Sequence, residues 1–459
     1  MPACTHLIDG DATASVPLTP LRKADLPAFL EHQPAAARWI GAVNFAAEPG
    51  THCLLPGVDG GLGRVLFGFG DEPIWDWAVL PEALPPGSYR IDGAQPPAEA
   101  TAAALGWALA TYRFDRYRKS AGEFARLIWP AAADREAVER TGDATFLVRD
   151  LINTPASDMG PAELADAIAA VADRFSARCT CIEGDALLAE NYPAVHAVGR
   201  ASARAPRLVD LMWGDESAPK LTLVGKGVCF DSGGLDIKPA GAMKLMKKDM
   251  GGAAVMLGLA QMVMAADLPL RLRLLVPAVE NSISGNALRP LDVVPTRQGR
   301  TVEIGNTDAE GRVVLADALA EAVAEEPALL IDCATLTGAA RVALGTEIPA
   351  LFANDDLLAD DILARSRECG DPLWRLPLWR PYRRHLRAKT AELTNAPDLP
   401  FAGAILAALF LAEFVGQRCP WAHLDMMAWN TERRPGRPEG GEAMGMRALY
   451  AVIEDRFRP

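Results

Sequence analysis

The stretch KLTLVGKGVCFDSGGLDIKP, residues 220–239, decides the fold class. Its first half is an apolar run, typical of a strand buried on both faces. A glycine-rich loop follows, and GGAAVMLGLAQMVMA (251–265) then has the length and composition of a buried helix. The next segment, LRLRLLVPAV (270–279), alternates like a strand. The sequence therefore predicts a strand–helix–strand unit of an α/β fold.

The same alternation continues towards the C-terminus. TVEIG (301–305) and ALLIDCATL (328–336) are predicted strands, and between them lies the predicted helix RVVLADALAEAVAEE (312–326). Such a pattern indicates a mixed or parallel sheet with helices on both faces. Ligand sites in these sheets form at the carboxyl ends of the strands.

The front of the chain has a different character. Residues 1–95 look irregular, with short strand-like runs such as RVLFGF (64–69) between Pro/Gly turns. Helical composition is predicted over 98–119 and again over 135–150. We expect an α/β protein with a smaller N-terminal α/β domain and a larger catalytic domain, whose mixed sheet is flanked by helices. The boundaries are an N-terminal variable domain at 1–130, a connecting helix or linker at 131–155, and the catalytic domain at 156–459.

Composition excludes several classes of protein. The 459 residues carry a formal net charge of −13, which argues against general nucleic-acid binding. The N-terminus MPACTHLIDG lacks the pattern of a secretory signal. The longest apolar run, 402–415, is too short to span a membrane. Eight scattered cysteines are typical of free thiols in a reducing cytoplasm, so a cytoplasmic location is expected.

Four carboxylates follow the predicted strands. They are Asp231, Asp249, Asp308 and Glu310, the last two within GNTDAEGR (305–312). Alone, that segment would be read as a polar turn. Gathered at one edge of a sheet, four carboxylates would repel one another and could not all ionise unless paired. Two divalent cations would balance their charge, and oxygen ligands suit Mn, Zn or Mg. The sequence therefore predicts a binuclear metal site.

Three cations lie near these acids. Lys226 could ligate a metal only as the neutral amine, and from the residues alone a salt bridge to the carboxylates is favoured. Lys238 and Arg312 could stabilise an oxyanion or hold an anion, although either could also be a solvated surface cation. For His423 a buried, hydrogen-bonded role is favoured over a ligand, and for Cys229 a core position is favoured over a redox role.

Several motifs together resemble the leucyl aminopeptidase family of cytosolic di-metal exopeptidases. The resemblance covers residues 98–459 and rests on YRFDRY (112–117), VGKGVCFDSGGLDIKP (224–239), MKKDMGGAA (246–254), PAVENSISGNALRP (277–290), NTDAEGR (306–312), DCATLTGA (332–339) and WAHLD (421–425). It implies a metal-dependent aminopeptidase that removes the N-terminal residue, Leu or another apolar one, from peptide substrates.

The resemblance also implies a role for each matching residue. One metal ion would be held tightly and a second would exchange more readily, with Asp231 and Glu310 bridging them. The metal ligands would be Lys226, Asp231, Asp249 and Glu310 for the first ion, and Asp231, Asp308 and Glu310 for the second. On this basis Lys226 becomes a ligand, contrary to the preference from the residues alone.

The remaining implied roles concern the reaction and the substrate. Lys238 would polarise the scissile carbonyl, and Arg312 would hold a bicarbonate ion that takes a proton from the attacking water, with help from the backbone near Leu336. Met246, Thr335 and Gly338 would line the pocket for the N-terminal side chain. The family assembles as homohexamers with active sites facing a central cavity. Ser157 and the pair Ala402-Gly403 depart from the family pattern, which bears on leucine preference rather than on hydrolysis.

Two rival readings belong to other classes. A regulatory protein that keeps the fold without activity could bind duplex DNA, which a salt-sensitive gel shift would reveal. A two-metal phosphoesterase would hydrolyse a chromogenic phosphate ester and ignore aminoacyl anilides. Intact ligand positions argue against an inactive protein, and the acidic N-terminal domain argues against DNA as a main partner.

Overall fold

The chain folds into two compact units. The computed structural model describes residues 2–10, 14–119 and 122–458. Unit 1 comprises 1–146 with 432–439, and unit 2 comprises 147–431 with 440–459. The expected linker at 131–155 contains helix α6 (Arg135–Asn153), and the division falls inside this helix. Segment 432–439, expected in the catalytic domain, groups with unit 1.

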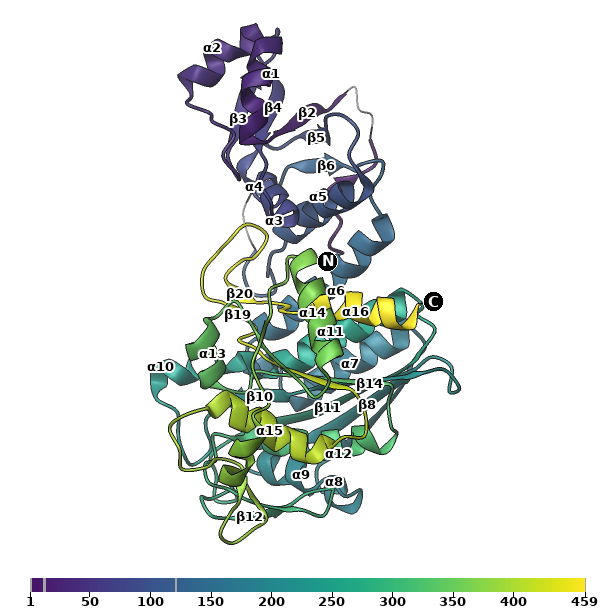
Figure 1. Cartoon of the computed structure of the whole chain (residues 1–459), viewed down its shortest axis with the longest axis vertical. Helices are drawn as coiled ribbons and strands as arrows, with labels where there is room; N and C mark the ends of the chain where they lie inside the picture. Colours follow the sequence, from purple (N-terminus) through teal and green to yellow (C-terminus); the bar gives the residue numbers. More distant parts are fainter. Residues whose placement is uncertain (1, 11–13, 120–121, 459) are drawn as a thin grey trace. The chain divides into compact units, whose positions relative to one another are not determined.

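Unit 1 is built on a six-stranded sheet in the order β1-β6-β5-β2-β4-β3, in which only β3 and β4 pair antiparallel (Figure 1). Val65 and Phe67 pack into one apolar cluster, and Leu66 into another on the opposite face. The strands are β1 (Leu7–Ile8), β2 (Val16–Leu21), β3 (His52–Pro56), β4 (Leu62–Gly68), β5 (Ser88–Ile91) and β6 (Arg126–Ile128), and the helices are α1 (Leu26–His32), α2 (Pro34–Ala42), α3 (Pro73–Trp77), α4 (Leu80–Ala83) and α5 (Pro97–Ala110).

Two expectations about unit 1 were wrong. Residues 1–95 are not irregular, because five strands lie there. Strand β2 was not predicted because it contains two prolines, which are unusual in a central strand. It pairs with β5 over residues 16–18 and with β4 over residues 18–21. The helix predicted over 98–119 ends at Ala110, where the Thr111 hydroxyl donates a hydrogen bond of 2.8 Å to the Ala108 carbonyl.

Unit 2 contains a nine-stranded mixed sheet, which confirms the predicted class of fold. Its main path is β16-β15-β18-β14-β9-β11-β8-β7. The ninth strand, β10, follows β9 in the chain and pairs parallel with the later part of β11, residues 278–281. The central strands β18, β14, β9 and β11 are parallel. The nine strands are β7 (Arg178–Glu183), β8 (Arg207–Trp213), β9 (Lys220–Gly225), β10 (Gly227–Asp231), β11 (Arg271–Asn281), β14 (Leu329–Ala334), β15 (Ala350–Ala353), β16 (Trp374–Arg375) and β18 (Trp421–Asp425).

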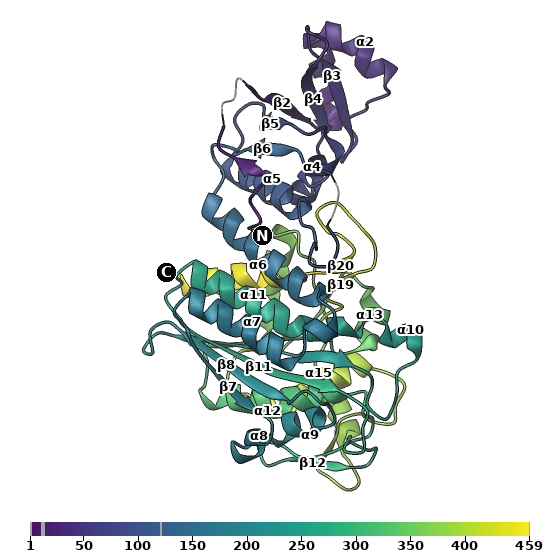
Figure 2. The same ribbon diagram turned by 180° about the vertical axis from the view of Figure 1, so that it is seen from behind.

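Helices cover both faces of this sheet (Figures 1 and 2). The first layer contains α7 (Pro161–Arg174), α11 (Gly251–Ala265), α14 (Asp356–Glu368) and α16 (Met446–Phe457), and the second contains α9 (Pro193–Gly199), α12 (Glu310–Ala324) and α15 (Gly403–Val415). Helix α11 is apolar all round because it lies between the sheet and α16.

One predicted sheet strand lies elsewhere. The TVEIG segment forms β13 (Thr301–Glu303), which belongs to a separate three-stranded sheet with β12 (Val293–Pro295) and β17 (Leu393–Thr394). The GNTDAEGR loop is therefore presented by this small sheet rather than by the central one.

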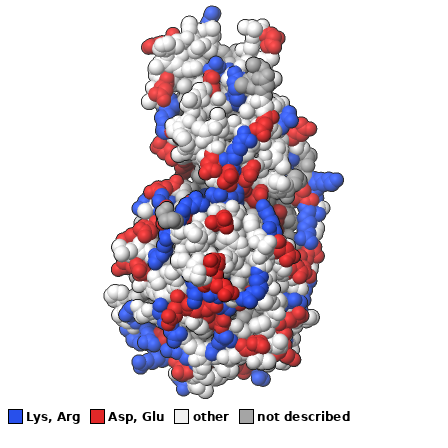
Figure 3. Space-filling view, turned by 90° about the vertical axis from the view of Figure 1, so that its right-hand side faces the viewer, with Lys and Arg blue, Asp and Glu red and all other residues white. Residues whose placement is uncertain are grey.

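The surface and the thiols agree with the composition. On the face drawn in Figure 3, basic and acidic side chains of the described residues are interspersed, so this face has no single-sign field. All eight cysteines lie in the described ranges and are free thiols. No helix in the described part of the chain has both the length and the apolar character needed to cross a bilayer.

Close packing of α11 on the sheet makes a first prediction. A Cβ added at Gly252 would lie 2.1 Å from the carbonyl oxygen of Cys333 in β14. We expect Gly252→Ala to lower the free energy of unfolding by about 1–3 kcal/mol, because helix and strand must separate. Denaturant unfolding followed by circular dichroism measures this.

Gly285→Ala is the matched control, since a Cβ there meets no atom within 4 Å. Equal stability of the two variants would contradict the packing described for α11.

Candidate metal centre

The four predicted carboxylates converge where the central strands end. Asp231 ends β10, Asp249 lies in the short helix η4 (Met246–Met250), and Glu310 begins α12. One oxygen each from Asp231, Asp308 and Glu310 lies within 4.8 Å of the others. Loops after different strands thus bring together residues far apart in the sequence, as expected for a sheet of this kind.

Each of two lysines bridges a pair of these carboxylates. The Lys226 Nζ lies 2.7 Å from Asp249 Oδ2 and 2.9 Å from Glu310 Oε1. The Lys238 Nζ lies 2.8 Å from Asp231 Oδ2 and also pairs with Asp308. Lys226 is therefore salt-bridged in this structure, the arrangement that its chemistry alone favoured.

Negative charge exceeds what the two lysines neutralise. Burial and the neighbouring Asp231 raise the pKa of Glu310 to about 8 and that of Asp308 to about 6. Burial would lower the pKa of Lys226, but Asp249 and Glu310 outweigh it and raise that pKa above its ordinary range. The cluster thus holds protons near neutral pH that a divalent cation would displace.

The donors suit divalent cations. They are hard carboxylate oxygens, and Asp231, Asp249 and Glu310 are all at least 97% buried. Glu310 Oε2 is buried and, among the described residues, accepts no hydrogen bond. A buried carboxylate oxygen without a donor is costly, and a metal ion would satisfy it.

Hydrogen bonds from neighbouring residues hold two of the carboxylates in place. The Asn281 amide donates to Asp231 Oδ1 at 2.8 Å, and the Gly233 N–H donates to the same oxygen at 2.9 Å. The Thr335 hydroxyl donates to Asp249 Oδ1 at 2.7 Å. The role of Asn281 was missed, although it is a buried polar residue that ends the apolar strand β11.

The GNTDAEGR loop is fastened by Asn395, which follows β17. Its Oδ1 accepts the Gly305 N–H at 2.8 Å, and its Nδ2 donates to the Asn306 carbonyl at 2.8 Å. Its own carbonyl accepts Arg312 Nη1 at 2.7 Å. Arg312 is buried, which lowers its pKa to about 10, so it remains charged at neutral pH. No local sequence signal marked Asn395.

Gly311 brings the helix start close to Lys226. A Cβ at this position would lie 2.5 Å from Lys226 Cε. Glycine is unfavourable in a helix, so its place in the first turn of an apolar helix was a signal for close approach that sequence reasoning passed over.

A cavity of about 340 Å³ adjoins the cluster. Its lining includes Met246, Thr335 and Gly338, the residues expected at the side-chain pocket, and also Leu336, whereas Glu310 and Arg312 do not line it. The Leu336 N–H already donates to Asp425 Oδ1 at 3.0 Å. Other lining residues are Lys226, Asp231, Lys238, Leu245, Lys248, Asp249, Asp308, Arg341, Ile348, Asp425, Met426 and Met427.

The other singled-out residues lie outside this lining. His423 is buried with Nδ1 2.6 Å from Asp332 Oδ1, and Cys229 is buried, so the favoured interpretations of both are confirmed. Ser157 lies in the short helix η3 (Ala156–Asp158). Ala402 has a φ of 57°, in the left-handed region that favours glycine, so alanine at this position strains the backbone. Ala402 does not line the cavity beside the metal centre.

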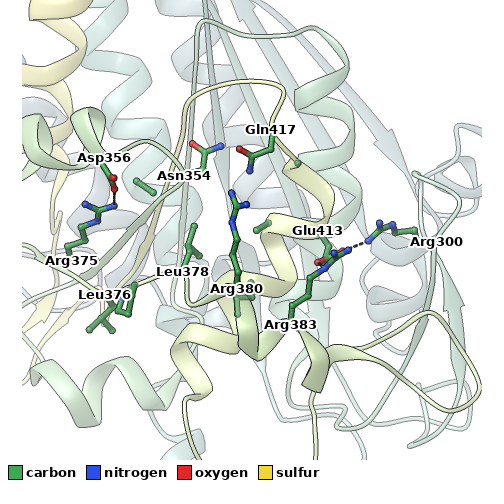
Figure 4. A pocket seen from close by; sticks show the side chains of 15 residues that line it. Arg300, Asn354, Asp356, Arg375, Leu376, Leu378, Arg380, Arg383, Glu413 and Gln417 are labelled. Atoms are coloured by element: carbon green, nitrogen blue, oxygen red, sulfur yellow. Dashed lines mark hydrogen bonds and ion pairs between the residues drawn. The ribbon is translucent and has the colours of Figure 1, made fainter.

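A larger cavity, of about 870 Å³, lies at the other end of β18 (Figure 4). β15 runs antiparallel to β18, so Asn354, which follows β15, lies near the start of β18, whereas Asp425 ends that strand. Four arginines lie in its lining, of which Arg300 and Arg383 pair with Glu413 and Arg375 pairs with Asp356. Guanidinium groups repel metal ions, so the metal centre does not lie there.

Comparisons with known proteins agree with this site. The protein-family model for the catalytic domain of the cytosol aminopeptidase family matches residues 146–450, and the family model for the M17 aminopeptidase N-terminal domain matches residues 16–130. A probable cytosol aminopeptidase of Leifsonia xyli subsp. xyli is 38% identical over 454 residues, covering 91% of this chain and 90% of the relative. One from Syntrophotalea carbinolica is 41% identical over 367 residues, covering 76% and 73%.

Solved structures are similar throughout the chain. The crystal structure of a cytosol aminopeptidase from Coxiella burnetii has a TM-score of 0.95 and 52% identity, covering 98% of this chain and 99% of that one. The bottromycin maturation enzyme BotP in complex with Mn has a TM-score of 0.87 and 37% identity, covering 97% and 100%. The two family domains, the full-length relatives and the carboxylate cluster lead to one conclusion: this chain belongs to the cytosol aminopeptidase family and is a metal-dependent aminopeptidase.

Proposed function

We propose that the carboxylate cluster holds two divalent ions and that the adjoining cavity takes the N-terminal residue of a peptide. The observation that carries this is the convergence of Asp231, Asp308 and Glu310 within 4.8 Å beside the cavity. The ligands would be Lys226, Asp231, Asp249 and Glu310 for one ion, and Asp231, Asp308 and Glu310 for the other. Mn or Zn is proposed, with Mg possible. Bound there, such ions supply Lewis acidity for a carbonyl and lower the pKa of a water molecule.

Lys226 and Lys238 would change partners on loading. Lys226 must give up a proton to become a ligand, and its pairing with Asp249 and Glu310 already places Nζ among the other ligands of that ion. Lys238, released from Asp231 and Asp308, would donate a hydrogen bond to the scissile carbonyl oxygen and stabilise the oxyanion.

Arg312 would hold a bicarbonate ion, which supplies a proton acceptor near neutral pH. Its guanidinium is buried, and among the described residues its Nε makes no hydrogen bond. Because the Leu336 N–H is engaged by Asp425, only the carbonyl of that residue is left to help. Arg312 therefore carries most of this binding.

Three methionines in the lining would contact an apolar N-terminal side chain such as Leu. Met246, Met426 and Met427 line the cavity, and unbranched methionines adapt to side chains of different shape. A volume of about 340 Å³ lies at the small end of ligand pockets, which suits an N-terminal residue and the peptide bond that follows it rather than a long peptide.

We further propose that the chain acts in the cytoplasm as a homohexamer. Large apolar side chains are exposed on unit 2, including Trp374 at 61%, Trp379 at 54% and Phe401 at 72%, as surfaces that meet other subunits often are. Light scattering should give a hexameric mass, and a monomeric mass would contradict this.

A rate panel tests the function. Chelated protein is assayed on aminoacyl-p-nitroanilides with Mn, Zn, Mg or no metal, beside Asp308→Ala. We expect metal-dependent release, reduced roughly a hundredfold or more in the variant, because one ion loses a ligand and its stabilisation of developing charge.

Asp361→Ala is the matched control, since Asp361 is an exposed aspartate on α14 of the same unit. It should retain the wild-type rate. Hydrolysis of a phosphate ester instead of the anilides, or turnover without metal, would contradict the proposal.

A further inference from the structure

Lys248 has no evident structural use. It stands in η4 directly before Asp249, lines the cavity and is only 5% exposed. Among the described residues, its amine takes part in no hydrogen bond or ion pair. A buried ammonium without a partner is destabilising, so its retention calls for a partner that this chain does not supply.

The adjacent lysine provides an internal comparison. The Lys247 amine donates to the Asn153 carbonyl at 2.6 Å and lies 5.4 Å from the Trp429 ring centroid. Lys247 does not line the cavity. Of two successive lysines, one is satisfied by its own unit and the other faces the substrate cavity.

Acids near Lys248 are already engaged. Asp249 pairs with Lys226 and accepts the Thr335 hydroxyl. Asp425 accepts the N–H groups of Leu336 and Thr337 at 3.0 Å each, and the Thr337 hydroxyl at 2.5 Å.

Arg341 adds a second positive charge to the same lining. A bound group that complements this wall would therefore be an anion. The neighbouring Met246 and Met426 would contact an apolar stem, so the anion is expected at the end of an aliphatic side chain.

We propose that Lys248, supported by Arg341, forms a carboxylate subsite that makes N-terminal glutamate a preferred substrate over its neutral isostere glutamine. The two methylene groups of glutamate contact the methionines, and its carboxylate pairs with the Lys248 ammonium. This inference rests on the proposed function, because it requires that the cavity hold the N-terminal side chain.

The test compares α-glutamyl-, glutaminyl- and leucyl-p-nitroanilide on metal-loaded protein. Glutamate and glutamine differ in charge but hardly in shape, so the ratio of their kcat/KM values isolates the charge. We expect wild type to favour glutamate, and Lys248→Met and Lys248→Gln each to lower the ratio about tenfold or more. Lys247→Met is the control and should leave the ratio unchanged.

The outcomes are distinguishable. If leucyl-anilide is hydrolysed but wild type does not favour glutamate, or the Lys248 variants keep the wild-type ratio, the carboxylate subsite is overturned and the aminopeptidase stands. If no anilide is hydrolysed with any metal, the proposed function fails and the subsite fails with it. A measurable ratio in either Lys248 variant suffices, so failure of one to fold does not prevent the test.

Discussion

Mutual repulsion among buried carboxylates is the constraint on which the site depends. Asp231, Asp249 and the pair Asp308 and Glu310 come from three separate segments, which the ends of the parallel strands and the small sheet bring together. Two lysines neutralise only part of this charge, and burial together with Asp231 raises the pKa of Glu310. Divalent cations bound among these carboxylates would relieve the repulsion, which is the physical reason for proposing a metal site here.

Close packing of the helices on the sheet also helps to hold the carboxylates together. Gly311 lets α12 approach Lys226, and Gly252 lets α11 approach β14, so helices on both faces are drawn close to the strand ends. The small sheet of β12, β13 and β17 contributes Asn395, which fixes the backbone around Asp308 and Glu310 and also holds Arg312. Ligands held on different elements can converge only if all of these elements are positioned with little freedom.

Much of this was predictable from local pattern. The apolar strand 220–230 and the apolar helix 251–265 can be predicted from their own residues, and the acidic residues after the strands predict a metal site. What could not be predicted depends on distant partners. The two prolines in β2 are typical of turns rather than of a central strand. The strand forms because β5 pairs with residues 16–18 and β4 with residues 18–21, a division that local sequence does not indicate. Asn395 lies in an ordinary loop sequence, and only the fold brings it to residues 305–312. Nothing in the sequence distinguished Lys248 from Lys247, and only the fold buries the first and ties the second to the Asn153 carbonyl.

We propose that this cluster holds two ions with Lys226 as a ligand. Anomalous diffraction from a crystal loaded with Mn tests it most directly. We predict two peaks roughly 3.5–4 Å apart, both contacted by Asp231 and Glu310, with the Lys226 Nζ within bonding distance of one. One peak, or none, or a Lys226 that remains paired with Asp249 and Glu310 away from any ion, would contradict the claim.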